Sequence, residues 1–427
     1  TKSLKFFNIA PASIGWTPNM HSGYIITLDK LSQILFFIFL ALLFYCLTDN
    51  EISKNNKILK STICFCLCVI TLVGYILPFS AAQMNLSASG VSADKRYYEN
   101  NEQVSKPADF MVDSYDLEFN FRNDLNAVAT IKTDDFKDEY KFTLYHGYKI
   151  SKITDGNNDE LNFTRDSDYL TIKNTSKSKL IKIYYHGSCD KYYSNYLSVF
   201  LPGNFAFYPI PGFNEMYSTH SYAGFDDLSL PYETDFNVTV HSLKKVQCNL
   251  ESSTNNEFKG KSDSLTLLSG FINCVTINKT QIYYPYFNDA YNSNTINEKL
   301  ETFVSKNPNI KKIFIIPDIN LEDIEFVKTF NDYMITASID DIDKLGFVSK
   351  ISANKMELYD AVNAYMNYPE YFEFLKENSS EELQKAIPVL EEILKNDNDG
   401  KKLEKINDYL IDNADDRAFS EFLCELR

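Results

Sequence analysis

Two long stretches without a charged residue near the N-terminus constrain this chain more than any other feature. Residues 31–48 carry no charge, and residues 61–93 carry none either, with the most apolar part running from about Ile63 to Phe79. As a helix, each stretch can cross a hydrocarbon core of about 30 Å, and both exceed what a buried core helix needs. The sequence therefore predicts two transmembrane helices within residues 31–83, with the lipid bilayer as a partner.

A short lysine-containing segment between the two stretches predicts their orientation. Lys54, Lys57 and Lys60 lie in residues 49–60, where we expect a tight loop. Short loops rich in lysine stay in the cytoplasm, whereas long acidic domains are translocated. We therefore expect a multi-pass protein of the cell membrane whose large domain, after about Gln83, is extracytoplasmic. Residues 1–30 are interpreted as the remnant of a longer membrane part.

The charge balance excludes one class of partner. The 427 residues include 58 acidic and 42 basic side chains, which gives a net charge of −16. Because nucleic acids are bound by basic surfaces, we expect no nucleic-acid partner.

The cysteines do not form a regular disulfide framework. Four of the eight lie in the apolar stretches, where they are interpreted as small buried hydrophobes. A bridge between Cys248 and Cys274 is conceivable outside the cytosol. The state of Cys189 and Cys424 stays open.

The middle of the chain has the period-two pattern of β-strands. Residues 84–111 are polar and predict a linker from the membrane to a domain. Tyr115, Leu117, Phe119 and Phe121 then alternate with polar residues, and the same alternation recurs several times before residue 287. Residues 112–287 are therefore predicted to form a mostly antiparallel β domain.

The last part of the chain is predicted to be mainly helical. Lys312–Pro317 is one short apolar strand, and helical spacing follows. Apolar residues from Leu383 to Leu394 share one helical face, opened by a capping box from Ser379 to Glu382. The predicted fold class is α+β and multidomain: a transmembrane hairpin, a β domain, and a helical domain over residues 288–427.

The order of these pieces resembles the zinc aminopeptidases of the aminopeptidase-N family. Phe207-Tyr-Pro-Ile-Pro-Gly-Phe resembles an aromatic-Tyr-Pro segment of that family, and Ile315-Ile-Pro-Asp318 comes between a helix and the all-helical end in the same order. The helices between Lys402 and Leu423 resemble its terminal helices. The resemblance covers roughly residues 112–427. It rests on the order of the motifs, because each motif by itself is only moderately specific. It implies a saddle-shaped β domain followed by a thermolysin-like domain.

The metal-binding motif of that family is absent. Its members need H-E-x-x-H on one helix and a distal Glu, but this chain has five histidines and none after His241. Tyr359–Tyr365 resembles the segment of the distal ligand, with Asp360 in the place of Glu. The family spacing then places Ala337 and Asp341 at the two histidines and Ser338 at the base.

The resemblance also marks two candidate ligand-binding positions. Glu322 falls near the place of the missing substrate-amine motif, and Tyr365 ends the segment that contains Asp360. We expect no catalytic residue, no metal and no cofactor.

Three functions are compatible with these observations. The leading hypothesis is a non-catalytic, aminopeptidase-like extracytoplasmic domain that binds or senses a peptide-like ligand. Such domains also occur joined to ABC-type export permeases, and the hairpin resembles the end of such a permease. This resemblance implies an ATPase subunit and the rest of the permease as partners. The alternatives are an active membrane-bound zinc aminopeptidase with unrecognised ligands and a membrane-anchored surface or adhesion protein.

Overall fold

The computed structural model describes most of the chain after the first 27 residues. The described residues are 28–48, 54–76, 93–316 (apart from 190, 197, 219–223, 226–227, 255 and 287–292), 327–339 (apart from 338) and 355–427 (apart from 368, 398–399, 413–414 and 416).

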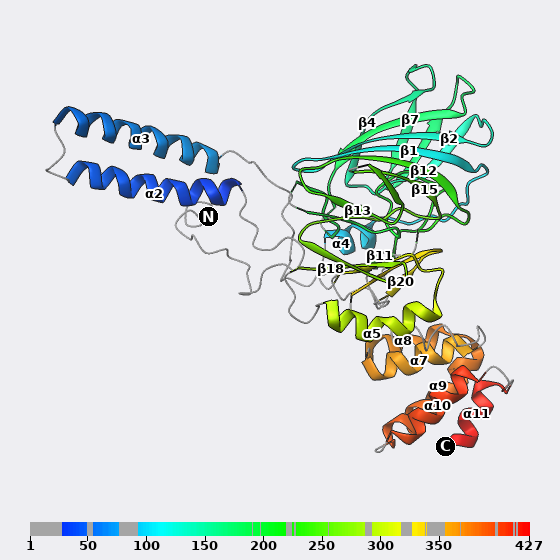
Figure 1. The fold of residues 1–427 in the computed structure, drawn as a ribbon. Coiled ribbons are helices and arrows are strands. Elements are labelled where there is room, and N and C mark those ends of the chain that lie inside the picture. Colours follow the sequence, from blue (N-terminus) through cyan, green and yellow to red (C-terminus); the bar gives the residue numbers. More distant parts are fainter. Residues whose placement is uncertain are drawn as a thin grey trace.

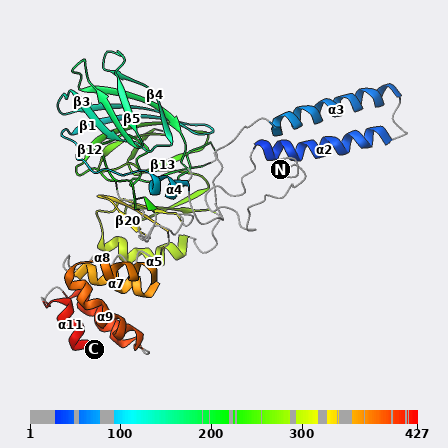
Figure 2. The same cartoon turned by 180° about the vertical axis from the view of Figure 1, so that it is seen from behind.

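The N-terminal part is a pair of antiparallel helices, α2 (Leu28–Thr48) and α3 (Lys54–Ile76), which lie apart from the strands in both views (Figures 1 and 2). Both helices are long and apolar enough to cross a membrane. Only 11% of the apolar part of each helix, Leu31–Thr48 and Asn55–Ile76, is buried. Large side chains such as Phe44, Phe65 and Ile70 are exposed. A core helix of a globular protein would be mostly buried, so these outward faces are better suited to lipid than to a protein core.

The two helices approach closely through small and polar residues. A Cβ atom on Gly74 would lie 2.8 Å from the Oγ atom of Ser32, and the side chain of Gln33 is fully buried. Small residues at such an interface allow close helix packing in membranes.

The predicted loop around Lys54 and Lys57 is wrong, because both residues lie within α3. Lysine and leucine are good helix formers, and long lysine side chains at a helix end can extend toward water. The end of the second predicted span, residues 77–83, lies outside the described residues.

A strand-rich part follows. Its strands are β1 (Val112–Phe121), β2 (Leu125–Thr133), β3 (Glu139–Thr143), β4 (Tyr148–Asp155), β5 (Phe163–Asp166), β6 (Tyr169–Lys173), β7 (Leu180–Gly187), β8 (Val199–Leu201), β9 (Ile210–Pro211), β10 (Tyr217–Ser218), β11 (Gly224–Phe225), β12 (Thr234–His241), β13 (Val246–Cys248), β14 (Glu251–Thr254), β15 (Glu257–Ser262) and β16 (Leu267–Ser269).

A seven-stranded sheet in the order β14-β15-β12-β1-β2-β7-β4 dominates this part. Its pairs are antiparallel except β1 and β12, which run parallel. Along β1 the predicted alternation is confirmed: Tyr115, Leu117 and Phe119 are buried, while Asp116 and Glu118 are exposed. A four-stranded sheet (β5-β6-β3-β9) and a three-stranded sheet (β13-β16-β8) complete the core.

A short helix, α4 (Ala93–Asn100), lies inside the segment predicted to be a linker. It packs on the β domain, because Tyr98 is buried and stacks on Tyr217 with ring centroids 4.8 Å apart. The hydroxyl of Tyr145 donates to Oδ1 of Asp94 at 2.5 Å.

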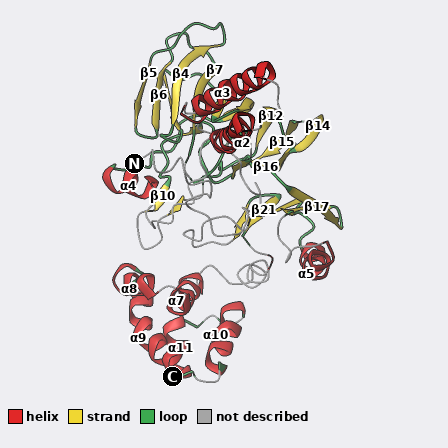
Figure 3. Cartoon of the chain, turned by 90° about the vertical axis from the view of Figure 1, so that its left-hand side faces the viewer, coloured by secondary structure: helices red, strands yellow, loops and turns green. Residues whose placement is uncertain are grey.

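A second sheet lies between the β domain and the helices (Figure 3). It has the order β17-β18-β19-β21-β20 and is accompanied by α5 (Ser293–Lys306). The sequence predicted one strand after residue 288, whereas the structure has three there, and the two strands before it join the same sheet. The five strands are β17 (Ile272–Ile277), β18 (Thr280–Pro285), β19 (Lys312–Ile315), β20 (Val327–Thr329) and β21 (Tyr333–Thr336).

The two faces of this sheet belong to different hydrophobic cores. Phe314 and Tyr333 join the core of the β domain. Ile313, Ile315 and Met334 pack in a separate core that includes residues of α5. Because side chains alternate along a strand, the sheet is fixed on one face to the β domain and covered on the other by a helix.

The C-terminal helices form a third core of their own. They are α7 (Met356–Asn367), α8 (Pro369–Asn378), α9 (Glu381–Lys395), α10 (Lys401–Ile411) and α11 (Phe419–Leu426). The predicted capping box is displaced by one residue, because the N-cap of α9 is Ser380 rather than Ser379. The Oγ atom of Ser379 instead donates to the Leu375 carbonyl at the end of α8.

Candidate functional site

The positions expected to carry a degenerate metal site are only partly described. Ala337 directly follows β21 and is buried. Ser338, Asp341 and Glu322 lie outside the described residues, so their convergence with Asp360 stays a prediction.

The two remaining predicted site residues lie on α7. Asp360 is exposed, and its negative charge adds to the main effect of burial in raising the pKa of Tyr371. Tyr365 is half-buried and packs edge-on against Phe372 of α8, with ring centroids 5.1 Å apart. Tyr365 therefore holds two helices together.

The residues at the aligned positions do not fit a zinc site. Ala337 has a methyl group where a histidine ligand is required, and no histidine stands at any of the four positions. Within the described part of the chain, no three His, Cys, Asp or Glu side chains are grouped as metal ligands.

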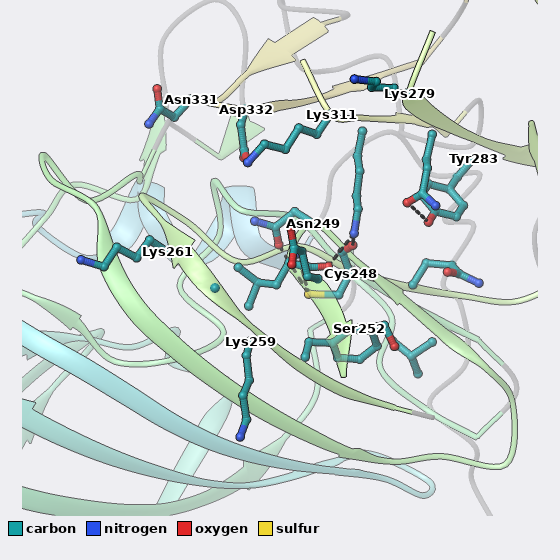
Figure 4. Close-up of a pocket in the computed structure, with 18 of the residues that line it drawn as sticks. Cys248, Asn249, Ser252, Lys259, Lys261, Lys279, Tyr283, Lys311, Asn331 and Asp332 are labelled. Carbon is teal, nitrogen blue, oxygen red and sulfur yellow. Dashed lines mark hydrogen bonds and ion pairs between the residues drawn. The ribbon is translucent and has the colours of Figure 1, made fainter. Parts of the chain in front are cut away.

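A cavity of about 1110 Å³ lies among the described residues between the β domain and the five-stranded sheet, which are here called the two sheet systems (Figure 4). Strands β13 to β15 form one side, and the starts of β18, β19 and β21 form the other. Figure 4 shows Lys279, Lys311 and Asp332 across from Lys259 and Lys261, with Cys248 and Asn249 between them.

The charge of this cavity is opposite to the charge of the chain. Six lysines line it together with three carboxylates, and no arginine is among the lining residues. The whole chain has an acidic excess and a net charge of −16. The lining lysines are Lys245, Lys259, Lys261, Lys279, Lys311 and Lys312, and the carboxylates are Glu233, Glu251 and Asp332.

Lys312 joins the two sides of the cavity. Its Nζ atom donates to the Cys248 carbonyl at 2.7 Å and to the Leu250 carbonyl at 2.5 Å. Burial lowers the pKa of Lys312, because an ammonium group is less well solvated there than in water. The two carbonyl groups fix this side chain in place at the start of β19.

The other cavity lysines differ in their partners. Lys311 pairs with Asp332, with Nζ and Oδ2 2.9 Å apart, and this hydrogen bond raises the pKa of Lys311. Lys245, Lys259 and Lys279 are exposed and have no ion-pair partner among the described residues. The cavity therefore has three lysines without an ion pair on three different elements, and its six lysines outnumber its three carboxylates.

The thiols near the cavity are not activated. Burial raises the pKa of Cys248 to about 12, so this group is a neutral thiol at physiological pH. Cys248 and Cys274 are both free, and the conceivable bridge between them is not formed.

Sequence reasoning missed this cavity, because its residues are spread over short strands and turns from Glu233 to Asp332. The available signal was local charge. Lysines recur in residues 244–261, and Lys311 and Lys312 are adjacent at the start of a predicted strand, although the chain as a whole is acidic.

Comparisons with known proteins identify similar structures but no family. No family model and no curated protein sequence matches the chain. Yeast LTA4 hydrolase in complex with bestatin is 14% identical, with a TM-score of 0.42 over 75% of this chain and 56% of that one. Native leukotriene A4 hydrolase from Saccharomyces cerevisiae is 13% identical, with a TM-score of 0.39 over 70% and 54% of the two chains.

An M1 zinc metallopeptidase from Deinococcus radiodurans, in a mutant form bound to the substrate Tyr-Ser-Ala, is 10% identical. Its TM-score is 0.38, over 66% of this chain and 74% of that one. This chain thus spans little more than half the length of the hydrolases it matches. The matching structures belong to the class that the sequence resemblance names, but TM-scores below 0.5 assign neither an activity nor a ligand.

Proposed function

We propose that this chain is a membrane-anchored, non-catalytic ligand-binding protein. Its two apolar helices hold the strand-rich and helical domains at the outer face of a bilayer, and these domains bind a peptide-like ligand without cutting it. The observation that carries this proposal is the cavity of about 1110 Å³ between the two sheet systems. Ligand sites commonly lie at such junctions between domains.

The sequence supports the absence of catalysis. The peptidases that this chain resembles hold zinc with two histidines one helical turn apart. No histidine follows His241, and the helices of the C-terminal half begin after that residue. Without imidazole ligands there, the chain has no means of activating a water molecule in the manner of those enzymes.

The membrane anchor supports a role at a surface. The outward faces of α2 and α3 are apolar, and the lysines at the start of α3 lie at one end of the pair. This arrangement is compatible with the last part of an ABC-type permease, whose ATPase subunit would be a partner of the assembled transporter. Recovery of an ATPase with the chain from native membranes, in stoichiometric amount, would support that assignment.

Peptide hydrolysis tests the proposed function. The purified full chain, supplied with zinc, is incubated with aminoacyl-anilide substrates and with short peptides, and yeast LTA4 hydrolase serves as the positive control. We expect peptides to be recovered intact. Zinc-dependent release of N-terminal residues at rates comparable to the control would overturn the proposal in favour of an active aminopeptidase.

A further inference from the structure

We propose that the lysine-lined cavity binds an extended acidic peptide segment, whose carboxylates pair with its ammonium groups. This inference rests on the proposed function and names the charge and conformation of the peptide-like ligand. Three observations carry it: the reversed charge of the cavity, its size, and the strand edge that borders it.

The reversed charge gives the cavity its selectivity. Three lysines, Lys245, Lys259 and Lys279, have exposed side chains without an ion-pair partner in the described part of the chain. They come from the turn before β13, from β15 and from the β17–β18 turn. The chain as a whole carries an acidic excess, so a place where lysines outnumber carboxylates attracts an acidic ligand locally. Lysines act as separate point charges, which suits several spaced carboxylates.

The volume of the cavity is large enough for a short peptide. Small-molecule pockets enclose roughly 300–1,000 Å³. This cavity encloses about 1110 Å³, and its lysines are distributed around it on both sheet systems. A single phosphate or carboxylate group would contact only a fraction of them, whereas a peptide can place several side chains along the cavity.

One strand edge borders the cavity and favours an extended peptide. Strand β14 is the end strand of the seven-stranded sheet, and its residues Glu251 and Ser252 line the cavity. All four residues of β14 are exposed. An end strand offers unpaired backbone N–H and C=O groups, and an added peptide strand can pair with them.

Lys312 is a positioning residue in this site. Its two hydrogen bonds hold the segment between β13 and β14 against β19, so the two sides keep their separation before a ligand arrives. A cavity that is ordered in advance loses less entropy on binding.

The test is binding of two matched peptides to the full chain in micelles of a neutral detergent. A short fluorescent peptide with Glu at alternate positions is compared by anisotropy with the same peptide carrying Gln. We expect the Glu peptide to bind about tenfold more tightly at low salt. We also expect this preference to shrink at high salt, because exposed ion pairs are screened. Equal affinity for the two peptides would overturn the inference.

Matched variants locate the site. In Lys245→Gln/Lys279→Gln, two unpaired ammonium groups of the cavity are removed, and the Glu peptide should bind about tenfold more weakly. The control is Lys149→Gln/Lys405→Gln, which removes two exposed and unpaired lysines elsewhere and should bind as the unmodified chain does. All four positions are exposed, so both variants should fold. Equal weakening of peptide binding by both variants would overturn the assignment of the binding site to this cavity.

Further arms separate the inference from its alternatives. Inorganic phosphate, added as competitor, should displace the Glu peptide only through ionic strength, as an equivalent amount of chloride salt does. Specific displacement by phosphate at low concentration, without preference for the Glu peptide, would make the cavity a phosphate site and overturn the inference. Tight binding of the Gln peptide alone would overturn the inference but leave the proposed function standing. Cleavage of the peptides would overturn both.

Discussion

The imidazole ring of His146 stacks on the phenol ring of Tyr97, with ring centroids 3.5 Å apart and an angle of 12° between the planes. Tyr97 belongs to α4, the first described element after the hairpin, and His146 follows β3. The backbone N–H of His146 donates to Oδ1 of Asp168 at 2.5 Å, and Nδ1 of the ring lies 3.2 Å from the same oxygen, which holds the ring in place. The helix that follows the apolar hairpin in the described part of the chain is thus docked on the β domain.

Replacing Tyr97 should loosen this docking. Tyr97→Ala removes the stacked ring and a hydrogen-bond partner of Ser167, and we expect a loss of about 2 kcal/mol in the free energy of unfolding. Limited proteolysis should then cut the chain faster within residues 93–100. The control Glu99→Ala changes an exposed residue of the same helix and should leave both quantities unchanged. Equal proteolysis of the two variants would mean that α4 does not depend on this contact.

The second prediction concerns the joint between the two sheet systems. The buried hydroxyl of Tyr333 lies 2.8 Å from Oγ of Ser264 and accepts a hydrogen bond from Oγ1 of Thr266 at 3.0 Å. Tyr333→Phe would leave these two buried hydroxyls without this partner, at a cost of about 1–3 kcal/mol in chemical denaturation. Tyr184→Phe is the control, since Tyr184 is half-buried on β7, and it should cost less. A negligible effect of Tyr333→Phe would mean that the hydroxyl of Tyr333 does not help to hold the two sheet systems together.

The third prediction distinguishes two adjacent serines. The Oγ atom of Ser380 accepts a hydrogen bond from the backbone N–H of Leu383 at 3.2 Å and caps α9. Ser380→Ala should therefore destabilise the helical domain by about 1 kcal/mol. Ser379→Ala should have a smaller effect on the thermal midpoint, because Ser379 does not cap this helix. The reverse order would support the capping box expected from the sequence.

The elements that the sequence predicts well are those with long, regular patterns. The alternation from Tyr115 to Phe121 follows the burial of β1, because one face of that strand is buried and the other exposed. The charge-free stretches overlap α2 and α3, since an apolar span of that length has few alternatives to a helix.

The elements that the sequence did not predict depend on tertiary contacts. Strand β20 has three residues and no periodic pattern, and it exists through pairing with β21. Strands β17 and β18 continue the alternation of the β domain. However, β18 pairs in parallel with β19, from which helix α5 separates it in the sequence. The lysine cavity combines residues that only the folded chain brings together.

The fourth prediction is a dependence of stability on pH. Hydrogen bonds from Arg417 lower the pKa of Asp415 to about 2. A carboxyl group with a depressed pKa in the folded state stabilises the fold above its unfolded pKa, about 3.9, and this contribution is lost as the pH falls toward 2. Acid unfolding of Asp415→Asn should therefore show a lower stability at neutral pH and a weaker loss between these two pH values.

The control for this prediction is Asp408→Asn, which changes an exposed carboxyl group on α10. Its acid unfolding should follow that of the unmodified chain. If Asp415→Asn and Asp408→Asn gave the same profile, the pair between Asp415 and Arg417 would not contribute to the pH dependence.

The claim that this chain binds a peptide without cutting it is tested most directly by its zinc content. The measurement is the zinc content per chain of the purified full protein by elemental analysis, after incubation with zinc and removal of the excess, together with its thermal midpoint with and without a strong chelator. We predict far less than one zinc per chain and an unchanged midpoint, because a domain of this size is stabilised by buried apolar area rather than by a metal. One zinc bound per chain, with a midpoint lowered by the chelator, would contradict the account.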